Sequence, residues 1–202
     1  MTQEDIAIAE NTLKQLDPIL GGVIESQILT APEMSDDYFA ALCKSIIGQQ
    51  VSVAAARTIY NRFVEVTELS PSKVALMSEA DIKQIGLSGR KASYVKDLAG
   101  RFVENPTVYN HLERQSDDDV ISELILVKGI GVWTAQMFLI FTLGRQDVFA
   151  PDDVGLQRAM MKLHDWDELP TKSALIDVSM KWSPYRSVAC LHLWRYLDNA
   201  PS

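Results

Sequence analysis

Two glycines one residue apart, Gly129 and Gly131, interrupt a strongly apolar stretch of this 202-residue chain. The flanking segments read LILV and VWTAQMFLIFTL, a composition typical of buried helices. Glycine takes backbone conformations that are closed to residues with a Cβ, and its amide leaves room for a close ligand. We predict a helix that ends at Lys128, a tight hairpin, and a helix that begins at Val132. Together they form a helix-hairpin-helix motif.

The hairpin also predicts a binding site for an anion. Amide N–H groups at the start of a helix behind a glycine loop attract negative charge, and DNA phosphate is the commonest anion for this arrangement. About twenty residues further on, Asp152 and Asp153 precede a predicted helix over 154–163. An aspartate in that position is commonly an N-cap. A phosphate-binding hairpin followed by carboxylates nevertheless favours chemistry on DNA over binding alone.

The composition indicates a folded protein without a membrane contact. Hydrophobic residues make up 47% of the chain, which is ample for a buried core in one large domain or two small lobes. No apolar run approaches the roughly 18 residues of a membrane span, and no secretory leader opens the chain. We expect an intracellular protein, in the cytoplasm or nucleoid of a bacterium or the nucleus of a eukaryote. Cys43 and Cys190 stand in apolar contexts that favour buried free thiols.

The charge is negative overall and unevenly distributed. The formal net charge is −8, and the first 37 residues hold eight acidic residues and one lysine. This argues against a protein that coats DNA, because non-specific affinity comes from many phosphate contacts. Basic residues gather between positions 81 and 101, which indicates either a local basic face or an ordinary solvated helix flank. These residues are Lys83, Arg90, Lys91, Lys96 and Arg101.

Apolar residues recur at helical spacing along the chain, and no segment shows the alternation of a strand. The fold class is therefore predicted to be all-α. Gly21 and Gly22 are predicted to form a turn after the first helix. Residues 35–105 are expected to form one lobe and residues 1–34 with 106–202 the other, with DNA in the cleft between them.

Four segments in this order resemble one known family, the helix-hairpin-helix (HhH-GPD) DNA glycosylase superfamily. The match is closest to its AlkA-type DNA-3-methyladenine glycosylase II group, in a compact form without the N-terminal β-domain of AlkA. The resemblance implies a two-lobed all-α fold with the active site in the cleft between the lobes. The segments are ALCKSIIGQQVSVAAARTIYNRF, IGLSGRKASYVKDLA, the hairpin with PDD, and KWSPYRSVACLHLW.

The resemblance implies a monofunctional glycosylase for base excision repair. Such an enzyme flips an alkylated purine, such as 3-methyladenine or 7-methylguanine, out of DNA and hydrolyses its N-glycosidic bond, leaving an abasic site. Asp153 matches the catalytic aspartate, whose carboxylate stabilises positive charge on the sugar, and Asp152 is left with a structural or capping role. Trp133 stands where bifunctional relatives carry a lysine, so no lyase activity is expected.

The resemblance also implies a base pocket. Trp133 and Trp194 match aromatic positions that attract a cationic alkylated base, while Met137 and Val154 replace aromatic residues and predict a narrower substrate range. The remaining tryptophans, Trp166 and Trp182, are assigned to the core.

The DNA contacts implied by the resemblance come from three loops. Gln50 matches the residue that fills the space of the flipped base, and Gln49 lies beside it. Gly129 and Gly131 present amides to a phosphate, with Thr134 capping nearby. The basic turn adds the remaining two contacts, Arg90 and Lys91.

No cofactor is expected to be required. Carbonyls of Val127 and Ile130 are candidate ligands for a monovalent cation, Na⁺ or K⁺, at the hairpin, and two cysteines cannot hold the four-cysteine iron–sulfur cluster of some relatives. The expected partner is double-stranded DNA with alkylated bases, bound by a monomer. Two alternatives stay open: a catalytically silent helix-hairpin-helix module that binds DNA, and a glycosylase for another lesion, such as uracil or oxidised guanine.

Overall fold

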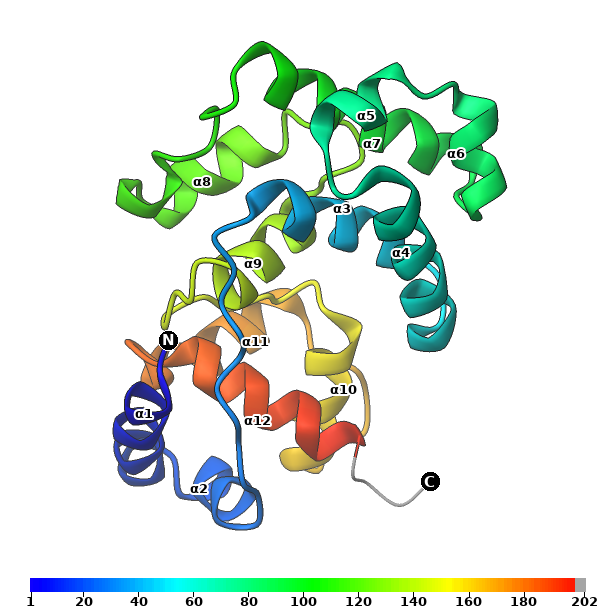
Figure 1. The fold of residues 1–202 in the computed structure, drawn as a ribbon. Coiled ribbons are helices and arrows are strands. Elements are labelled where there is room, and N and C mark those ends of the chain that lie inside the picture. Colours follow the sequence, from blue (N-terminus) through cyan, green and yellow to red (C-terminus); the bar gives the residue numbers. More distant parts are fainter. Residues whose placement is uncertain (199–202) are drawn as a thin grey trace. The chain divides into compact units, whose positions relative to one another are not determined.

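The computed structural model describes residues 1–198, and in that range every regular element is a helix (Figure 1). The all-α prediction is confirmed for these residues. None of their helices has the length and apolar content needed to cross a membrane. The α-helices are α1 (Gln3–Leu16), α2 (Pro18–Glu25), α3 (Tyr38–Gly48), α4 (Val53–Thr67), α5 (Pro71–Leu76), α6 (Glu79–Ile85), α7 (Gly89–Glu104), α8 (Asp117–Leu124), α9 (Val132–Phe141), α10 (Val154–Leu163), α11 (Lys172–Ser179) and α12 (Arg186–Asp198), with short 3₁₀ helices at Leu112–Arg114 and Met180–Trp182.

The chain groups into two compact units. The first, called the terminal unit, comprises Met1–Met34 and the chain from Leu139 onward. The second, called the hairpin unit, comprises Ser35–Phe138. The sequence-based division differs from this one in residues 106–138, which it groups with the chain ends.

Contacts with α7 explain why residues 106–138 group with the hairpin unit. The ring of Tyr109 packs edge-to-face on that of Phe102, with centroids 5.4 Å apart. The Arg101 guanidinium donates a hydrogen bond to the Leu126 carbonyl over 2.6 Å. Both partners on α7 lie in the segment that the sequence assigned to the other lobe, so tertiary packing on α7 decides the boundary.

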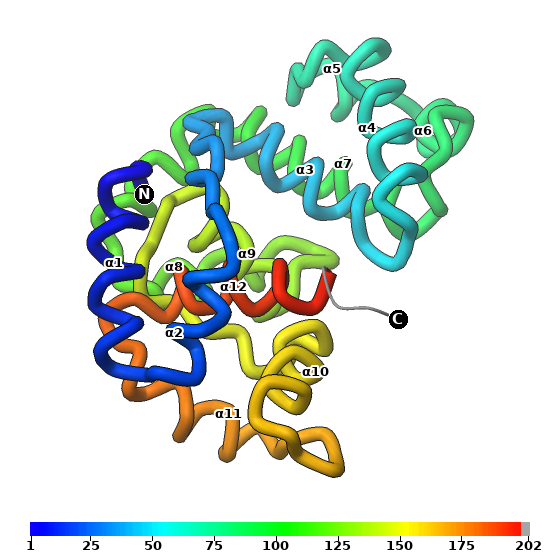
Figure 2. The backbone as a smooth tube through the Cα atoms, turned by 90° about the horizontal axis from the view of Figure 1, so that it is seen from below, coloured from blue at the N-terminus to red at the C-terminus, as the bar shows by residue number. Residues whose placement is uncertain are grey.

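Helix α12 lies at the centre of the terminal unit, where α1, α2 and α10 pack against it (Figure 2). Leu193 of α12 is fully buried, as is the thiol-bearing Cys190. Trp182, just before α12, is also fully buried, and its indole N–H donates to Asp17 Oδ2 over 2.8 Å. The predicted core position of Trp182 and the predicted free cysteines, including the buried Cys43 of the hairpin unit, are confirmed.

Gly21 and Gly22 lie inside helix α2, so the predicted turn is wrong. Asp17 caps this helix by accepting the amides of Ile19 and Leu20, and Pro18 occupies its first position, where proline favours a helix. A Cβ on Gly21 would lie 3.4 Å from the Cα of a residue in α1. The glycine therefore serves close packing of two helices, which a local pattern cannot reveal.

In the hairpin unit, α7 is the central element, and α3, α5 and α6 pack against it. Ala92, Val95, Leu98 and Ala99 on α7 are fully buried. Serines cap the neighbouring helices by accepting amides of the first turn, as for Ser78 before α6, where Asp81 completes a capping box. Of the predicted DNA contacts, Gln49 and Gln50 follow α3, Gly129 and Gly131 precede α9, and the others lie in the first turns of α7 and α9.

Candidate functional site

The hairpin differs in detail from its prediction. Helix α8 ends at Leu124, four residues earlier than predicted, whereas α9 begins at Val132 as predicted. Only Gly129 takes a left-handed conformation, with φ +83°, and a Cβ there would lie 2.1 Å from the ring of Tyr94. A Cβ on Gly131 would meet nothing within 4 Å. Gly129 is therefore required by the fold, and Gly131 leaves open space beside the start of α9.

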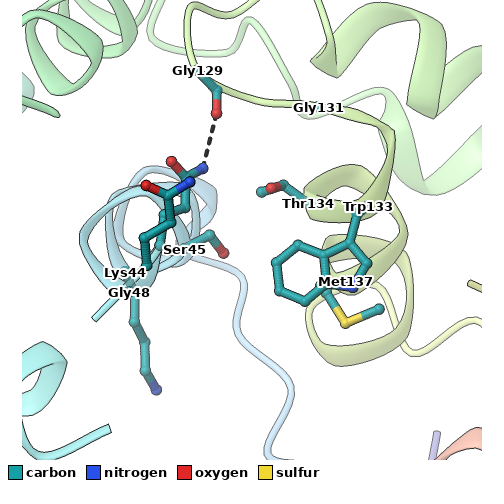
Figure 3. Close-up of a pocket in the computed structure, with 10 residues that line it drawn as sticks. Lys44, Ser45, Gly48, Gly129, Gly131, Trp133, Thr134 and Met137 are labelled. Atoms are coloured by element: carbon teal, nitrogen blue, oxygen red, sulfur yellow. Dashed lines mark hydrogen bonds between the residues drawn. The ribbon is translucent and has the colours of Figure 1, made fainter. Parts of the chain in front are cut away.

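A pocket of about 540 Å³ lies within the hairpin unit between α3 and α9. Figure 3 shows Trp133 and Met137 on the α9 side and Ser45 and Gly48 on the α3 side. The Trp133 side chain is 43% exposed, so its ring is accessible to a ligand. The lining residues are Lys44, Ser45, Gly48, Gln49, Gln50, Gly129, Gly131, Trp133, Thr134 and Met137.

This pocket brings together most of the predicted site residues of the hairpin unit, but not Arg90, Lys91, Val127 or Ile130. Trp133, Met137 and Thr134 join the glycines of the hairpin and the two glutamines that follow α3. Lys44, Ser45 and Gly48 also line it and were not predicted as site residues. The signal was available, because Lys44 and Ser45 lie four and three residues before Gly48 and therefore on the same face of α3.

The loop after α3 is strained and tightly held. Gln50 is exposed and has φ 55°, a left-handed conformation that costs a residue with a Cβ roughly 1–2 kcal/mol. The Gln49 side-chain amide donates to the Gly129 carbonyl over 2.8 Å (Figure 3). The Lys91 ammonium donates to the carbonyls of Ile47 and Gln49 over 2.8 and 2.6 Å, and burial lowers the pKa of Lys91. The loop and the hairpin are thus joined within one unit.

Most basic side chains of the predicted basic face form hydrogen bonds within the hairpin unit. The ammonium of Lys91, a predicted DNA contact, donates to the backbone carbonyls of Ile47 and Gln49. Lys96 donates to the carbonyls of Ala75 and Met77 in the same way. Arg90, the other predicted contact in this turn, is exposed. Of the basic residues that the sequence groups here, Lys91, Lys96 and Arg101 thus donate hydrogen bonds to backbone carbonyls of the hairpin unit.

Asp153 lies in the terminal unit as the N-cap of α10. Its Oδ1 atom accepts the Leu156 amide over 2.8 Å and the Trp194 indole N–H over 2.9 Å. The side chain is half-buried. Asp152 is exposed and pairs with the Lys172 ammonium over 2.6 Å. The capping role that the sequence assigned to Asp152 therefore belongs to Asp153, and Asp152 has a surface ion pair instead.

Aromatic and small residues shape the surroundings of this carboxylate. Trp194 is half-buried and stacks on Phe141, with ring centroids 5.8 Å apart. A Cβ on Gly155 would lie 2.9 Å from Asp153 Oδ1 and 3.2 Å from Trp194, so glycine is needed there. Val154 is 51% exposed. Phe141 and Gly155 were not predicted, although the glycine directly after Asp153-Val154 was a visible signal.

The remaining tryptophan, Trp166, is half-buried and stacks on His164, with centroids 4.8 Å apart. It lines a second cavity, of about 530 Å³, in the terminal unit with Leu169 and Leu197. The prediction that Trp166 belongs to the core is therefore wrong, because the residue is only half-buried and lines this cavity.

The hairpin offers backbone oxygens of the kind that a monovalent cation prefers. The Val127 carbonyl accepts the Ile130 amide over 3.1 Å. A carbonyl oxygen has two lone pairs, so this bond leaves capacity for a cation. The donor set of Val127 and Ile130 is therefore compatible with Na⁺ or K⁺.

Comparison with known proteins identifies the family. Residues 43–184 match the HhH-GPD superfamily of base excision DNA repair proteins. YfjP of Bacillus subtilis, provisionally named as a DNA-3-methyladenine glycosylase, is 31% identical over 188 residues, which are 89% of this chain and 66% of that relative. The chain therefore spans about two thirds of the length of YfjP.

Solved structures agree with this match. A 3-methyladenine DNA glycosylase of Schizosaccharomyces pombe, in complex with abasic DNA, has a TM-score of 0.83 and 28% identity over 93% of this chain and 95% of that one. A DNA-3-methyladenine glycosidase of Bacillus halodurans has a TM-score of 0.82 and 35% identity, covering 95% and 89%. The resemblance inferred from the sequence is confirmed. The chain belongs to the HhH-GPD superfamily of base excision DNA repair proteins.

Proposed function

We propose that this protein is a DNA glycosylase that removes alkylated purines from double-stranded DNA in base excision repair. Its family repairs DNA by base excision, and the relatives described above are named for 3-methyladenine. The observation that carries the proposal is the carboxylate of Asp153, which accepts two N–H donors and stands at a helix N-terminus. These contacts hold the carboxylate in a fixed orientation at the start of α10.

Asp153 acts on the sugar. When the bond between C1′ and the base nitrogen breaks, its electron pair leaves with the base, and positive charge develops on the sugar. A carboxylate beside the sugar stabilises this charge, and water then adds to C1′ and loses a proton. Trp194 acts as a positioning residue, because its N–H holds Asp153 Oδ1 in place. The product is an intact abasic site.

Recognition of the base involves the exposed ring of Trp133. A methylated purine such as 3-methyladenine or 7-methylguanine carries positive charge, which an aromatic face attracts by roughly 0.5–2 kcal/mol. Trp194 is the second aromatic residue proposed for recognition, and in the terminal unit its ring stacks on Phe141. Met137 and Val154 add apolar surface without a ring, which supports a narrower range of substrates.

DNA is held through its backbone and by a side chain that enters the duplex. The hairpin with Gly129 and Gly131 binds a phosphate at the start of α9, next to the buried Thr134. A cation on the carbonyls of Val127 and Ile130 would add positive charge there. Gln50 fills the space left by the flipped base. The protein works as a monomer.

The reaction is hydrolytic and involves no lyase step. A lyase needs an amine that attacks C1′ and forms a Schiff base, and Trp133 has none. Borohydride therefore traps no covalent adduct between the protein and DNA. An adduct would contradict this part of the proposal.

The test uses purified protein and duplex DNA treated with a methylating agent. Released bases are separated by chromatography, and strand breaks are measured before and after alkali. We expect release of 3-methyladenine and 7-methylguanine, with breaks only after alkali. Binding without release from this DNA, while DNA containing uracil or oxidised guanine is processed, would indicate another lesion. Binding without release from any substrate would indicate a silent DNA-binding module.

A further inference from the structure

One face of α7 supports both of the loops that we propose to contact DNA. The inference drawn from it rests on the proposed function. The side chains on this face are three or four residues apart, which places them in one row along the helix. They are Lys91, Tyr94, Asp97 and Arg101.

Lys91 holds the loop after α3. Its ammonium donates to the carbonyl of Ile47, in the last turn of α3, and to that of Gln49, the residue that follows the helix. Carbonyls at the end of a helix lack intrahelical partners and carry partial negative charge, so a cation there both caps and stabilises the end. The backbone on the N-terminal side of Gln50 is therefore fixed to α7.

Gln49 is fixed at two points. Its carbonyl accepts the Lys91 ammonium, and its side-chain amide donates to the Gly129 carbonyl. Gln50 follows directly, with its side chain exposed and its backbone in the left-handed region. A strained conformation persists only where the surrounding structure holds it. The contacts of Gln49 supply that restraint on one side of Gln50.

The same face of α7 also holds the hairpin. The Tyr94 ring lies against Gly129, so closely that no Cβ would fit. Asp97 accepts the Lys128 amide over 3.3 Å and pairs with the Lys128 ammonium over 3.4 Å. The loop after α3 and the hairpin thus have a common support, and their separation is set by α7 together with the hydrogen bond from Gln49.

We propose that Lys91 and Gln49 are positioning residues for base flipping. They hold Gln50 in the conformation from which its side chain enters the duplex, and they set its place relative to the hairpin that binds phosphate. Neither residue needs to touch the reacting atoms. Their loss therefore impairs the extrusion of a paired base more than the hydrolysis of a base that is already unpaired.

The test compares Lys91→Met, Lys91→Arg and Gln49→Met with Lys96→Met as a matched control. Lys96 lies on the same helix and also donates to two backbone carbonyls, at the end of α5 and away from the loop. The substrates are duplexes with one 7-methylguanine, either paired with cytosine or facing an abasic site. Base release is measured under single-turnover conditions, and thermal unfolding is measured for every variant.

For the paired substrate we expect Lys91→Met and Gln49→Met to release base about 10- to 100-fold more slowly than wild type, as expected for misplaced groups. For the unpaired substrate the loss stays within about three-fold, because less pairing and stacking must be broken. Lys91→Arg restores most of the paired rate, since a guanidinium can donate to both carbonyls. Lys96→Met lowers the melting temperature without this difference between substrates. Equal losses on both substrates, or the same pattern in Lys96→Met, would overturn the inference.

A second measurement separates this inference from the proposed function. A 2-aminopurine next to the lesion fluoresces when stacking is lost, whether or not the base is cleaved. If wild type binds the duplex but releases no base, the proposed activity is refuted. Bound wild type should nevertheless raise the fluorescence, whereas bound Lys91→Met should not. No rise with wild type, or an equal rise with Lys91→Met, refutes the positioning role.

Discussion

The indole Nε1 of Trp194 lies 2.9 Å from Oδ1 of Asp153, and the two residues are 41 positions apart in the chain. Oδ1 also accepts the Leu156 amide of the first turn of α10, so one carboxylate oxygen is oriented by its own helix and by α12. A Cβ on Gly155 would disturb both partners. The catalytic assignment of Asp153 and the positioning role of Trp194 therefore lead to separable predictions.

Replacement of Asp153 by asparagine should lower the single-turnover rate of base release by about 10²- to 10³-fold, the usual loss for a well-placed electrostatic group. Asparagine also caps helices, so α10 should keep its stability. Affinity for methylated duplex should be unchanged. Asp152→Asn is the control, because its ion pair with Lys172 is exposed and should matter little. Equal loss of binding and excision in Asp153→Asn would contradict the assignment.

Trp194→Phe removes the N–H donor and keeps a ring to stack on Phe141. A hydrogen bond to a charged group contributes about 1.5–3 kcal/mol, so kcat should fall by about 10-fold or more with little change in KM. Steady-state kinetics on methylated duplex measure both constants. Trp166→Phe, in the same unit but stacked on His164, should leave both unchanged. A similar fall in both variants would indicate a general packing effect.

Gly129→Ala and Gly131→Ala should behave differently. Alanine at 129 places a Cβ 2.1 Å from the Tyr94 ring at φ +83°, so the free energy of unfolding should fall by about 2 kcal/mol or more. Alanine at 131 meets no atom within 4 Å, so the protein should remain stable, but a Cβ in that open space should weaken DNA binding. Urea unfolding and DNA titration measure the two effects. Equal destabilisation by both substitutions would refute this distinction.

The buried carboxyl group of Asp17 should make the free energy of unfolding depend on pH in the acidic range. Burial would by itself raise the pKa of its carboxyl, but hydrogen bonds from Trp182, Lys181 and the Leu20 amide outweigh it and leave the pKa below its ordinary value of 3.8. The stabilisation is therefore complete above the unfolded value near 3.8 and is lost as the pH falls through the lower folded pKa.

Asp17→Asn tests this dependence. The variant should be less stable than wild type at neutral pH by about 1–3 kcal/mol, because the ion pair with Lys181 is lost. The difference should shrink as the pH is lowered below about 4, where wild type also loses the charge. Urea unfolding over that pH range measures it. A constant difference down to the lowest pH would show that ionisation of Asp17 contributes nothing.

The sequence by itself determined the features that depend on neighbours a few residues away. Helical periodicity predicted the all-α class, Asp153 before an apolar segment predicted a helix start at Val154, and the hairpin with its motif neighbours predicted the family. Such signals are local because a helix forms from bonds and caps within about four residues.

Only the tertiary structure decided how these local pieces meet. It showed that Lys91 binds carbonyls at the end of α3, that Gly129 is closed by Tyr94 while Gly131 is open, and that Trp194 orients Asp153. The partners in these contacts are 35 or more residues apart in sequence. Such partners are brought together when helices that are distant in sequence pack against each other. The sequence of one segment therefore does not reveal which side chains of another segment it will contact.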